Sequence, residues 1–408
     1  MTLAVDAAAE VRLLLIGRGL RAFVDGYVAI LLPAYLLALG YDTWHVGLLS
    51  TATLLGSALA TLALGVWGHR AAPRTLLLAA ALLMTATGLG FAGLSDFWPL
   101  LLVAFVGTLN PSAGDVSVFL PLEHSRLAIA AEGNVRTRLF ARYSLTGALC
   151  AAIGALAVGA PDALAGLGVD RLLALRLMFV AYAGVGALIW LLYALLPSRP
   201  PGTPAPAMSP LGPSRGIVVR LAALFSVDAF AGGLVVNSLL ALWLFERFGL
   251  SLAAAGAFFF WAGLLGALSQ LVAPRLARRI GLLNTMVFTH IPSSLFLILA
   301  AFAPDLGLAL SFLLLRAALS QMDVPTRSAY VMAVVTPPER AAAASFTAVP
   351  RSLAAASSPT LAGLLFAGGW FAAPLVACGV LKIAYDLALW RSFRRHAVDQ
   401  VVSKVESR

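Results

Sequence analysis

The 408-residue sequence has few charged residues, two cysteines and almost no lysine. Charged residues make up 11% of the chain and hydrophobic residues 61%, so a water-soluble core could not cover this much apolar surface. Cys150 and Cys378 lie within apolar runs of opposite halves, which argues against a disulfide framework. The composition is that of a protein whose solvent is lipid.

The sequence also lacks the common motifs of catalysis and nucleotide binding. It contains no GxSxG, HExxH or Walker motif, and no dinucleotide fingerprint in a strand-helix-strand context. The five histidines show no metal-ligand spacing and mostly lie at predicted loop edges. The first ten residues are acidic and lack the basic region of a cleavable signal peptide. We therefore expect no enzyme activity, no cofactor and no metal site.

The net charge of +10 comes almost entirely from arginine, because Lys382 and Lys404 are the only lysines. The basic residues are scattered between apolar segments instead of clustering on one face, so they predict anchoring at a membrane surface and no nucleic-acid partner.

Twelve apolar segments are long enough to cross a bilayer, which needs about 20 residues. They lie near 11–39, 44–67, 74–94, 97–121, 138–160, 171–196, 216–245, 251–272, 281–302, 306–334, 340–367 and 370–391. A segment with seven prolines, 197–215, separates the first six from the last six and predicts an extended linker. The predicted domains are two six-helix bundles, 1–196 and 216–396, this linker, and a tail at 397–408.

Arginine placement predicts the orientation. If the N-terminus lies inside, the inner loops and tail hold most of the arginines, whereas the outer loops are short and mostly acidic. The positive-inside rule then places both termini and the linker in the cytoplasm. We expect a multi-pass protein of a bacterial cytoplasmic (inner) membrane.

Polar residues recur in the same order in both halves. Asp25 and Asp228 are each followed at +11 by the sequence LLAL. Asp115 and Asp323 each precede a valine in the fourth and tenth segments, and Arg142 and Arg351 each stand near Ser-Leu in the fifth and eleventh. This order predicts an internal duplication of six helices.

With twelve spans, a central linker and both termini inside, the chain resembles the major facilitator superfamily over its whole length. The loop between the second and third spans, 65–77, retains Gly65, Arg70, Arg74 and Leu77 of that family's loop motif, but has His69 at the acidic position. The resemblance implies two pseudo-symmetric bundles that transport a solute by alternating access, with Arg70 and Arg74 in a gating loop. It also implies that spans 1, 4, 7 and 10 line a central cavity.

Four intramembrane aspartates, Asp25, Asp115, Asp228 and Asp323, fall on those four spans, where an ionisable residue is costly and usually functional. We expect Asp25 and Asp228 to exchange the coupling proton; the alternative is a structural ion pair. For Asp115 and Asp323 we favour gating or structural pairs. Their expected partners are Arg142 for Asp115, and Arg351 or, one turn away, Arg327 for Asp323.

Further polar residues within the spans are expected to face the cavity. Arg21 is one turn from Asp25 and predicted to pair with it, whereas Arg18 either joins a gating pair or extends toward the membrane surface. Arg316 either meets Asp228 or binds an anionic group of the substrate. Asn110-Pro111 and Asp323-Val324-Pro325 predict breaks in spans 4 and 10. The remaining cavity candidates are Asn237 and Gln321.

These features predict a monomeric secondary transporter of a small organic solute, driven by protons and working as an exporter. Import or facilitated diffusion of a small solute, with or without an anionic group, is the alternative within the same fold. The helix 4 and helix 5 motifs of drug/proton antiporters are missing, which weakens that specific assignment. A membrane sensor or scaffold that does not transport is the alternative from another class.

Overall fold

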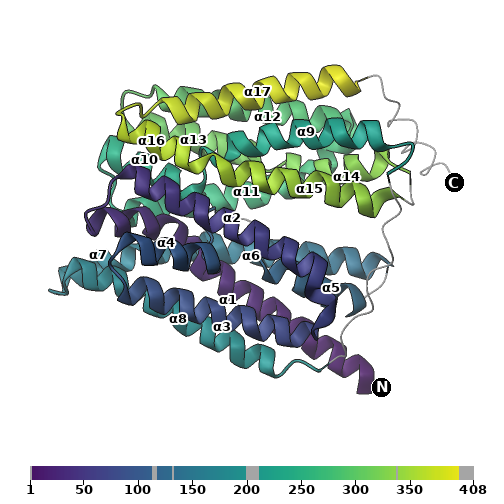
Figure 1. The fold of residues 1–408 in the computed structure, drawn as a ribbon. Helices are drawn as coiled ribbons and strands as arrows, with labels where there is room; N and C mark the ends of the chain where they lie inside the picture. Colours follow the sequence, from purple (N-terminus) through teal and green to yellow (C-terminus); the bar gives the residue numbers. More distant parts are fainter. Residues whose placement is uncertain (1, 113–116, 131–132, 199–210, 337–338, 395–408) are drawn as a thin grey trace. The chain divides into compact units, whose positions relative to one another are not determined.

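The computed structural model describes residues 2–112, 117–130, 133–198, 211–336 and 339–394. Within these ranges all regular secondary structure is helical, which confirms the predicted all-α class (Figure 1). The chain forms two compact units. Unit 1 comprises residues 1–205, 236–261 and 359–367, and unit 2 comprises 206–235, 262–358 and 368–408.

Unit 1 holds the helices of the first sequence half together with short segments of the second. Its helices are α1 (Thr2–Ala38), α2 (Thr43–Trp67), α3 (Pro73–Gly93), α4 (Phe97–Val106), α5 (Phe119–Ala130), α6 (Gly133–Leu156), α7 (Ala160–Gly166), α8 (Arg171–Ala194), α10 (Asn237–Phe248), α16 (Pro359–Ala367) and the first part of α11 (Leu252–Ile280). Two 3-10 turns, η1 (Gly68–Arg70) and η2 (Ala157–Gly159), complete it.

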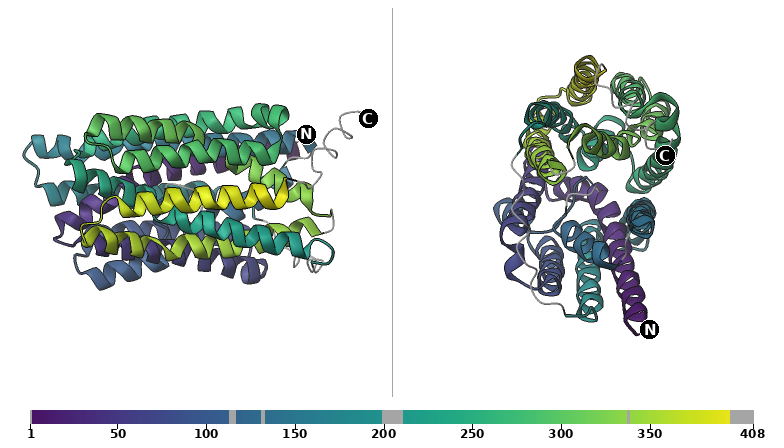
Figure 2. Two further views of the ribbon diagram at one scale, coloured as in Figure 1. Left: turned by 90° about the horizontal axis from the view of Figure 1, so that it is seen from above. Right: turned by 90° about the vertical axis from the view of Figure 1, so that its right-hand side faces the viewer.

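Unit 2 holds the remaining helices of the second half. These are α9 (Arg215–Gly233), the rest of α11, α12 (Leu282–Ala301), α13 (Leu306–Ser320), α14 (Asp323–Val334), α15 (Arg340–Ser357) and α17 (Ala373–Phe393). Within each unit the long helices run roughly alongside one another, as the two views of Figure 2 show.

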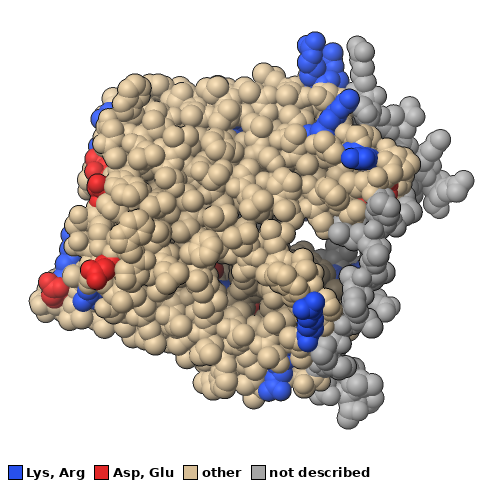
Figure 3. Space-filling model, in the orientation of Figure 1, with Lys and Arg blue, Asp and Glu red and all other residues tan. Residues whose placement is uncertain are grey.

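Ten helical segments in the described part of the chain are long and apolar enough to cross a membrane. They correspond to ten of the twelve predicted spans. The other two predicted spans, 97–121 and 340–367, are each built from two helices, α4 with α5 and α15 with α16. Large side chains such as Leu82, Leu102 and Phe288 are more than half exposed, as expected where a helix faces lipid. On the face drawn in Figure 3, charged side chains lie mainly at helix ends.

Breaks interrupt four of the predicted spans. Span 4 is broken after Val106, at a stretch that includes Asn110-Pro111, and span 10 is broken at Gln321 and Met322. Spans 7 and 11 were expected to be continuous, but span 7 is interrupted between Gly233 and Asn237 and span 11 at Ser358. The predicted breaks near Asn110-Pro111 and Asp323 are therefore confirmed, and two further breaks were missed.

Close contact between α1 and α6 depends on two glycines. A side chain at Gly26 would lie 2.1 Å from the carbonyl oxygen of Ala151, and one at Gly154 would lie 1.9 Å from that of Phe23. The two helices therefore pack backbone against backbone, as small residues allow in membrane bundles. This packing sets the position of the polar residues that α1 carries.

Candidate functional site

Each unit buries a cluster of ionisable side chains. The N-terminal cluster, in unit 1, consists of Arg18, Arg21, Asp25, Glu123, Tyr143 and Tyr193. The C-terminal cluster, in unit 2, consists of Asp228, His290, Asp323, Arg327, Lys382 and Asp386. Because a charged group within a membrane bundle needs a partner, the pairing in each cluster indicates what it can do.

A two-pronged ion pair forms the base of the N-terminal cluster. Nη1 and Nη2 of Arg21 on α1 lie 2.6 and 2.8 Å from the two carboxylate oxygens of Glu123 on α5. Both side chains are sealed from solvent, with exposed fractions of 2% and 0%. The planar guanidinium matches the carboxylate edge to edge, which is the strongest form of this interaction.

Two tyrosines complete the shell around Glu123. The hydroxyls of Tyr143 on α6 and Tyr193 on α8 both donate to its carboxylate, and Tyr143 also accepts from Arg21 at 3.3 Å. Four helices of unit 1 are thus joined through one carboxylate. A buried polar network with all its members bonded specifies one arrangement of the helices that carry it.

Asp25 lies one turn along α1 from Arg21 but does not share its partner. The expected Arg21–Asp25 hydrogen bond is absent from the described contacts, because Arg21 donates to Glu123 instead. Asp25 is 5% exposed, and within the described part of the chain its Oδ1 atom has no hydrogen-bond partner. The positive charges of Arg21 and Arg18 lie within electrostatic reach. Asp25 is therefore a buried carboxylate with an open acceptor.

In the C-terminal cluster, Asp228 on α9 has cations on several sides. Its Oδ1 atom accepts from Nζ of Lys382 on α17 at 2.6 Å, and its Oδ2 atom lies 3.3 Å from Nη2 of Arg327 on α14. Nε2 of His290 on α12 lies 3.8 Å from Oδ1. In contrast to Asp25, Asp228 is held by two permanent positive charges.

Two further carboxylates extend this cluster. Arg327 also donates to Asp323, one turn earlier on α14, which confirms the i,i+4 contact considered from the sequence. Nδ1 of His290 lies 3.2 Å from Oδ1 and 3.0 Å from Oδ2 of Asp386 on α17. The cluster thus holds three carboxylates, two permanent cations and one imidazole.

The predicted cavity residues lie in varied surroundings. Asn110 is buried in the break of span 4, where its Oδ1 atom accepts from the backbone and hydroxyl of Ser112. Gln321, in the break of span 10, is exposed and accepts from Gln270. Asn237 is the first residue of α10. Within the described residues, the guanidinium of Arg316 on α13 has no hydrogen-bond or ion-pair partner.

The predicted gating residues are divided between the interior, where Arg18, Asp323 and Arg327 are buried, and the surface. Arg74 donates to the carbonyl of Ala194 at the end of α8, whereas Arg70, Arg142 and Arg351 are exposed. Arg18 lies over the ring of Tyr143, 5.1 Å from its centroid. The expected partner of Arg142, Asp115, lies outside the described residues.

Six residues of the two clusters were missed from the sequence, two of them the tyrosines Tyr143 and Tyr193 that bind Glu123. Glu123 follows the predicted end of span 4, and His290 was taken for a histidine near a loop edge, although α12 carries it well inside the unit. Lys382 and Asp386 lie in predicted span 12. Their i,i+4 spacing within an apolar run was the available signal.

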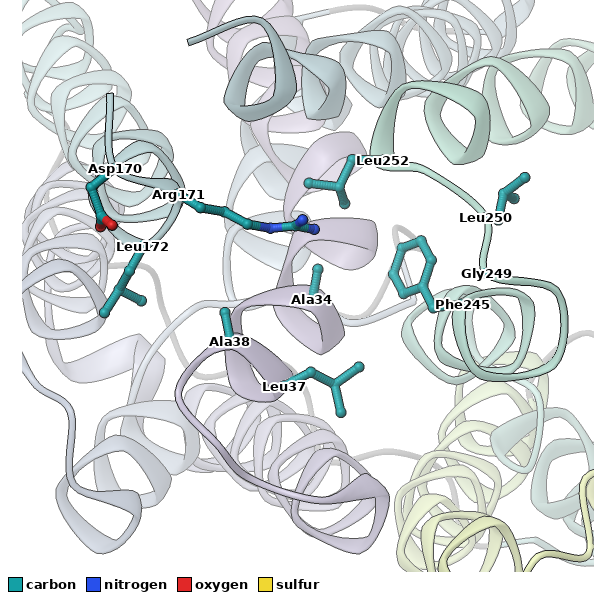
Figure 4. A pocket seen from close by; sticks show the side chains of 10 residues that line it. All are labelled: Ala34, Leu37, Ala38, Asp170, Arg171, Leu172, Phe245, Gly249, Leu250 and Leu252. Carbon is teal, nitrogen blue, oxygen red and sulfur yellow. The ribbon is translucent and has the colours of Figure 1, made fainter. Parts of the chain in front are cut away.

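Unit 1 also has a cavity away from the N-terminal cluster. It has a volume of about 530 Å³ and lies among the end of α1, the start of α8, the end of α10 and the start of α11. Arg171 extends into it between Ala34 and Phe245, as Figure 4 shows. Its walls are otherwise mainly apolar, and the charged side chains among its lining residues are Arg171 and Asp170.

Comparison with solved structures shows what the fold resembles. The nucleoside transporter NupG aligns with a TM-score of 0.73 and 16% identity, covering 94% of this chain and 99% of that one. A bacterial homolog to the human lysosomal transporter Spinster, inward-facing and occupied, gives 0.72 and 17%, covering 94% and 97%. The human organic anion transporter MFSD10 gives 0.63 and 15%, covering 94% and 99%. At such identities the likeness shows the fold alone.

Comparison of sequences shows the family. The uncharacterized membrane protein YJR124C of Saccharomyces cerevisiae (strain ATCC 204508 / S288c) is 24% identical over 419 aligned positions, covering 94% of each chain. The family model described as Major Facilitator Superfamily matches residues 14–320, most of the chain. The predicted resemblance is confirmed: the chain belongs to the Major Facilitator Superfamily and is a membrane transporter rather than an enzyme.

Proposed function

We propose that this protein is a proton-coupled secondary transporter that exports a small organic solute by alternating access. Both termini lie on the cytoplasmic side of a bacterial inner membrane in this proposal, in accord with the positive-inside distribution of arginine. The observation that carries the proposal is the buried Asp25 carboxylate, one of whose oxygens has no hydrogen-bond partner among the described residues.

Asp25 is suited to exchange a proton because its charged form is poorly compensated. A buried carboxylate with one oxygen left without a hydrogen bond is costly when ionised, and protonation reduces that cost. The ion pair of Arg21 with Glu123 holds α1 in place while Asp25 changes its charge. A positive charge on the substrate, or a change in the positions of Arg18 and Arg21, would favour release of the proton.

Asp228 is the second proposed coupling residue, at the corresponding place in the duplication. It is compensated by Lys382 and Arg327, so it would take part only when one of these cations moves away. Asp25 is therefore the primary proton carrier in the proposal, and Asp228 responds to its cationic partners.

Arg316 supplies the strongest indication of substrate chemistry. Its guanidinium has no hydrogen-bond or ion-pair partner in the described part of the chain, and buried arginines of membrane bundles normally have one. An anionic group on the solute would be such a partner. Asn110, Asn237 and Gln321 remain proposed cavity residues that would supply neutral hydrogen bonds.

Transport by purified protein in vesicles tests the function. We would load proteoliposomes with uridine, xylose or benzenesulfonate, the last being an organic anion that cannot cross as a neutral acid. The expected result is efflux or uptake of at least one probe that accelerates when a pH gradient is imposed. Asp25→Asn should abolish the pH-driven part, whereas the exposed control Asp96→Asn should keep it.

The outcome also separates the alternatives. Flux that ignores the pH gradient in the wild type would replace proton coupling with facilitated diffusion. Flux of benzenesulfonate that is lost in Arg316→Gln and ignores Asp25→Asn would favour the alternative of an anion importer or uniporter. If all three probes, and a wider panel screened by thermal stabilisation, leave the protein unaffected, the sensor or scaffold hypothesis takes its place.

A further inference from the structure

His290 and Asp386 form a pair that the proposed coupling residues do not include. His290 projects from α12 and Asp386 from α17, and their exposed fractions are 5% and 1%. The imidazole Nδ1 atom lies 3.0 and 3.2 Å from the two oxygens of the carboxylate. The pair is thus sealed within unit 2 and close enough to share a proton.

Among the described residues, Asp386 is the one carboxylate of the C-terminal cluster that has no permanent cation bound to it. Asp228 and Asp323 are in contact with Lys382 and Arg327, so four charges compensate one another. In the described part of the chain, the only group in ion-pair contact with Asp386 is His290. If both members of the pair are deprotonated, the Asp386 carboxylate is buried with no cation in ion-pair contact among the described residues, and one added proton supplies its counter-charge.

Charged and titratable groups on five helices lie around the pair. From α9, α13, α14, α15 and α17 the charged or titratable neighbours are Asp228, Arg316, Asp323, Arg327, Arg351, Cys378, Lys382 and Tyr385. Among the described residues, Arg316 makes no ion pair with a carboxylate of the cluster. It adds positive potential near the pair without an ion pair to Asp386.

Lys382 links the pair to Asp228. Its Nζ atom lies 2.6 Å from Oδ1 of Asp228 and 3.3 Å from Nε2 of His290. An ammonium group only donates, so in this arrangement Nε2 offers its lone pair and the ring hydrogen is on Nδ1, facing Asp386. A proton that arrives at Nε2 would end this hydrogen bond.

We propose that His290 and Asp386 bind a single exchangeable proton and that Lys382 transmits its arrival to Asp228. The inference rests on the proposed proton-coupled function and adds a second proton site to it. When the proton binds Nε2, the imidazolium and the Asp386 carboxylate form a neutral pair. Lys382 then loses its contact with His290 and is held by Asp228 alone.

Loss of the proton reverses these steps. Nε2 regains its lone pair, the pair becomes negative, and Lys382 is drawn from Asp228 toward it. Asp228 then has less positive charge close to it. It can accept a hydrogen bond from a substrate, or it can bind a proton. No other bond forms or breaks, and the proton comes from and returns to water. Lys382 acts as a positioning residue, since it carries the signal without holding the exchanged proton.

Proton uptake by the purified protein tests the shared site without any substrate. The pH of a weakly buffered detergent solution is lowered from about 8 to about 5, the range in which histidine changes charge, and the protons bound per protein are measured with an indicator dye. We expect His290→Gln and Asp386→Asn each to bind one proton fewer than the wild type. The double variant should also bind one fewer, because the two residues share the proton.

Other patterns contradict the proposal. Uptake equal to the wild type in both single variants, or a loss of two protons in the double variant, would show no shared site. Asp96→Asn is the matched control, as an aspartate-to-asparagine change at an exposed position. If one single variant fails to elute as a folded monodisperse protein, the other decides against the wild type.

Lysine chemistry gives an independent readout of the link to Asp228. Lys382 and Lys404 are the only lysines, so a protein labelled with ε-15N lysine has two side-chain signals, which Lys404→Arg assigns. The Lys382 signal should move between about pH 8 and 5 in the wild type and stay constant in Asp386→Asn. A constant wild-type signal would refute the role of Lys382. Because neither measurement needs transport, failure of the proposed function leaves their results distinct.

Discussion

Each buried cluster contains one aspartate of the predicted duplication, Asp25 or Asp228, but the two aspartates have different surroundings. Asp25 on α1 has an open carboxylate oxygen, because the neighbouring Arg21 is bound by Glu123. Asp228 on α9 is held by Lys382 and Arg327. In the described part of the second half it is instead Asp386 that has no permanent cation bound to it.

The different surroundings of Asp25 and Asp228 indicate that the two halves of the predicted duplication share a pattern of charges but not a set of contacts. Each cluster binds its arginine tightly to a carboxylate, Glu123 or Asp323, and each leaves one further carboxylate for exchange in our proposals. The exchangeable site moved from the aspartate of the first helix to a histidine-aspartate pair on other helices. Two halves of one fold would then respond to protons at different points of the transport cycle.

The largest effect should come from the ion pair that organises unit 1. Glu123→Gln removes the charge that compensates Arg21 while keeping the size of the side chain. Breaking a buried pair on one side costs about 3–5 kcal/mol, so unfolding in detergent should occur at a much lower temperature. Glu246→Gln is the control, because Glu246 is exposed and has no such partner role; a change there should stay within about 0.5 kcal/mol.

A melting temperature of Glu123→Gln equal to that of Glu246→Gln would mean that the Glu123 network contributes little to stability. The N-terminal cluster would then contain no strongly stabilising ion pair, and the two clusters would not differ in the way described above.

The second test concerns the pair that compensates Asp228. Asp228→Asn leaves Lys382 without its closest acceptor, and Lys382→Met leaves Asp228 with Arg327 alone. Each single variant should be destabilised, and the double variant less than the sum, with a coupling of about 0.5–3 kcal/mol from a double-mutant cycle of unfolding free energies. Strictly additive effects would show that the 2.6 Å contact is not a strong interaction.

Much of the fold could be predicted because hydrophobic runs report directly on lipid-spanning helices. Length, proline and charge placed the spans, and the sequence around Asn110-Pro111 indicated a break that the structure contains. The break at 234–236 was missed because its residues, Leu-Val-Val, are as apolar as the flanking helices. A local change of backbone direction there depends on packing that the pattern does not express.

The site was only partly predictable, for a geometric reason. The sequence gives the depth of a residue along a helix but not the direction in which it points, so Arg21 was paired with Asp25 on its own helix when its partner is Glu123, 102 positions away. The family resemblance also points to spans 1, 4, 7 and 10 and says nothing of span 12. Lys382 and Asp386 on span 12 are two of the six residues of the C-terminal cluster.

The third test compares the stability of Asp25→Asn with that of Asp228→Asn. Since the Oδ1 atom of Asp25 has no hydrogen-bond partner among the described residues, replacing the carboxylate removes few contacts. Its unfolding free energy should lie within about 1 kcal/mol of the wild type, in contrast to Asp228→Asn. The measurement is thermal unfolding of both variants in the same detergent. A loss of stability at Asp25 equal to that at Asp228 would mean that both aspartates are structural.

The smallest effect is expected outside the spans, at Glu339. Its carboxylate accepts from the backbone of Gly212 and Ser214 and from the hydroxyl of Thr336, 2.6 Å away, and so ties the start of α9 to the start of α15. Hydrogen bonds from Ser214 and Thr336 lower the pKa of Glu339 from 4.5 to about 2.

A carboxylate whose pKa is lower in the folded protein than in the unfolded chain stabilises the fold at a pH above the unfolded-state pKa. It loses that contribution as the pH falls toward the folded-state pKa. Glu339→Gln should therefore melt slightly below the wild type at pH 7, and the difference should shrink between about pH 4.5 and 2. Glu246→Gln should show no such pH-dependent difference. A difference for Glu339→Gln that stays constant down to the lowest pH at which both proteins remain folded would show that the charge of Glu339 is not what joins the two helices.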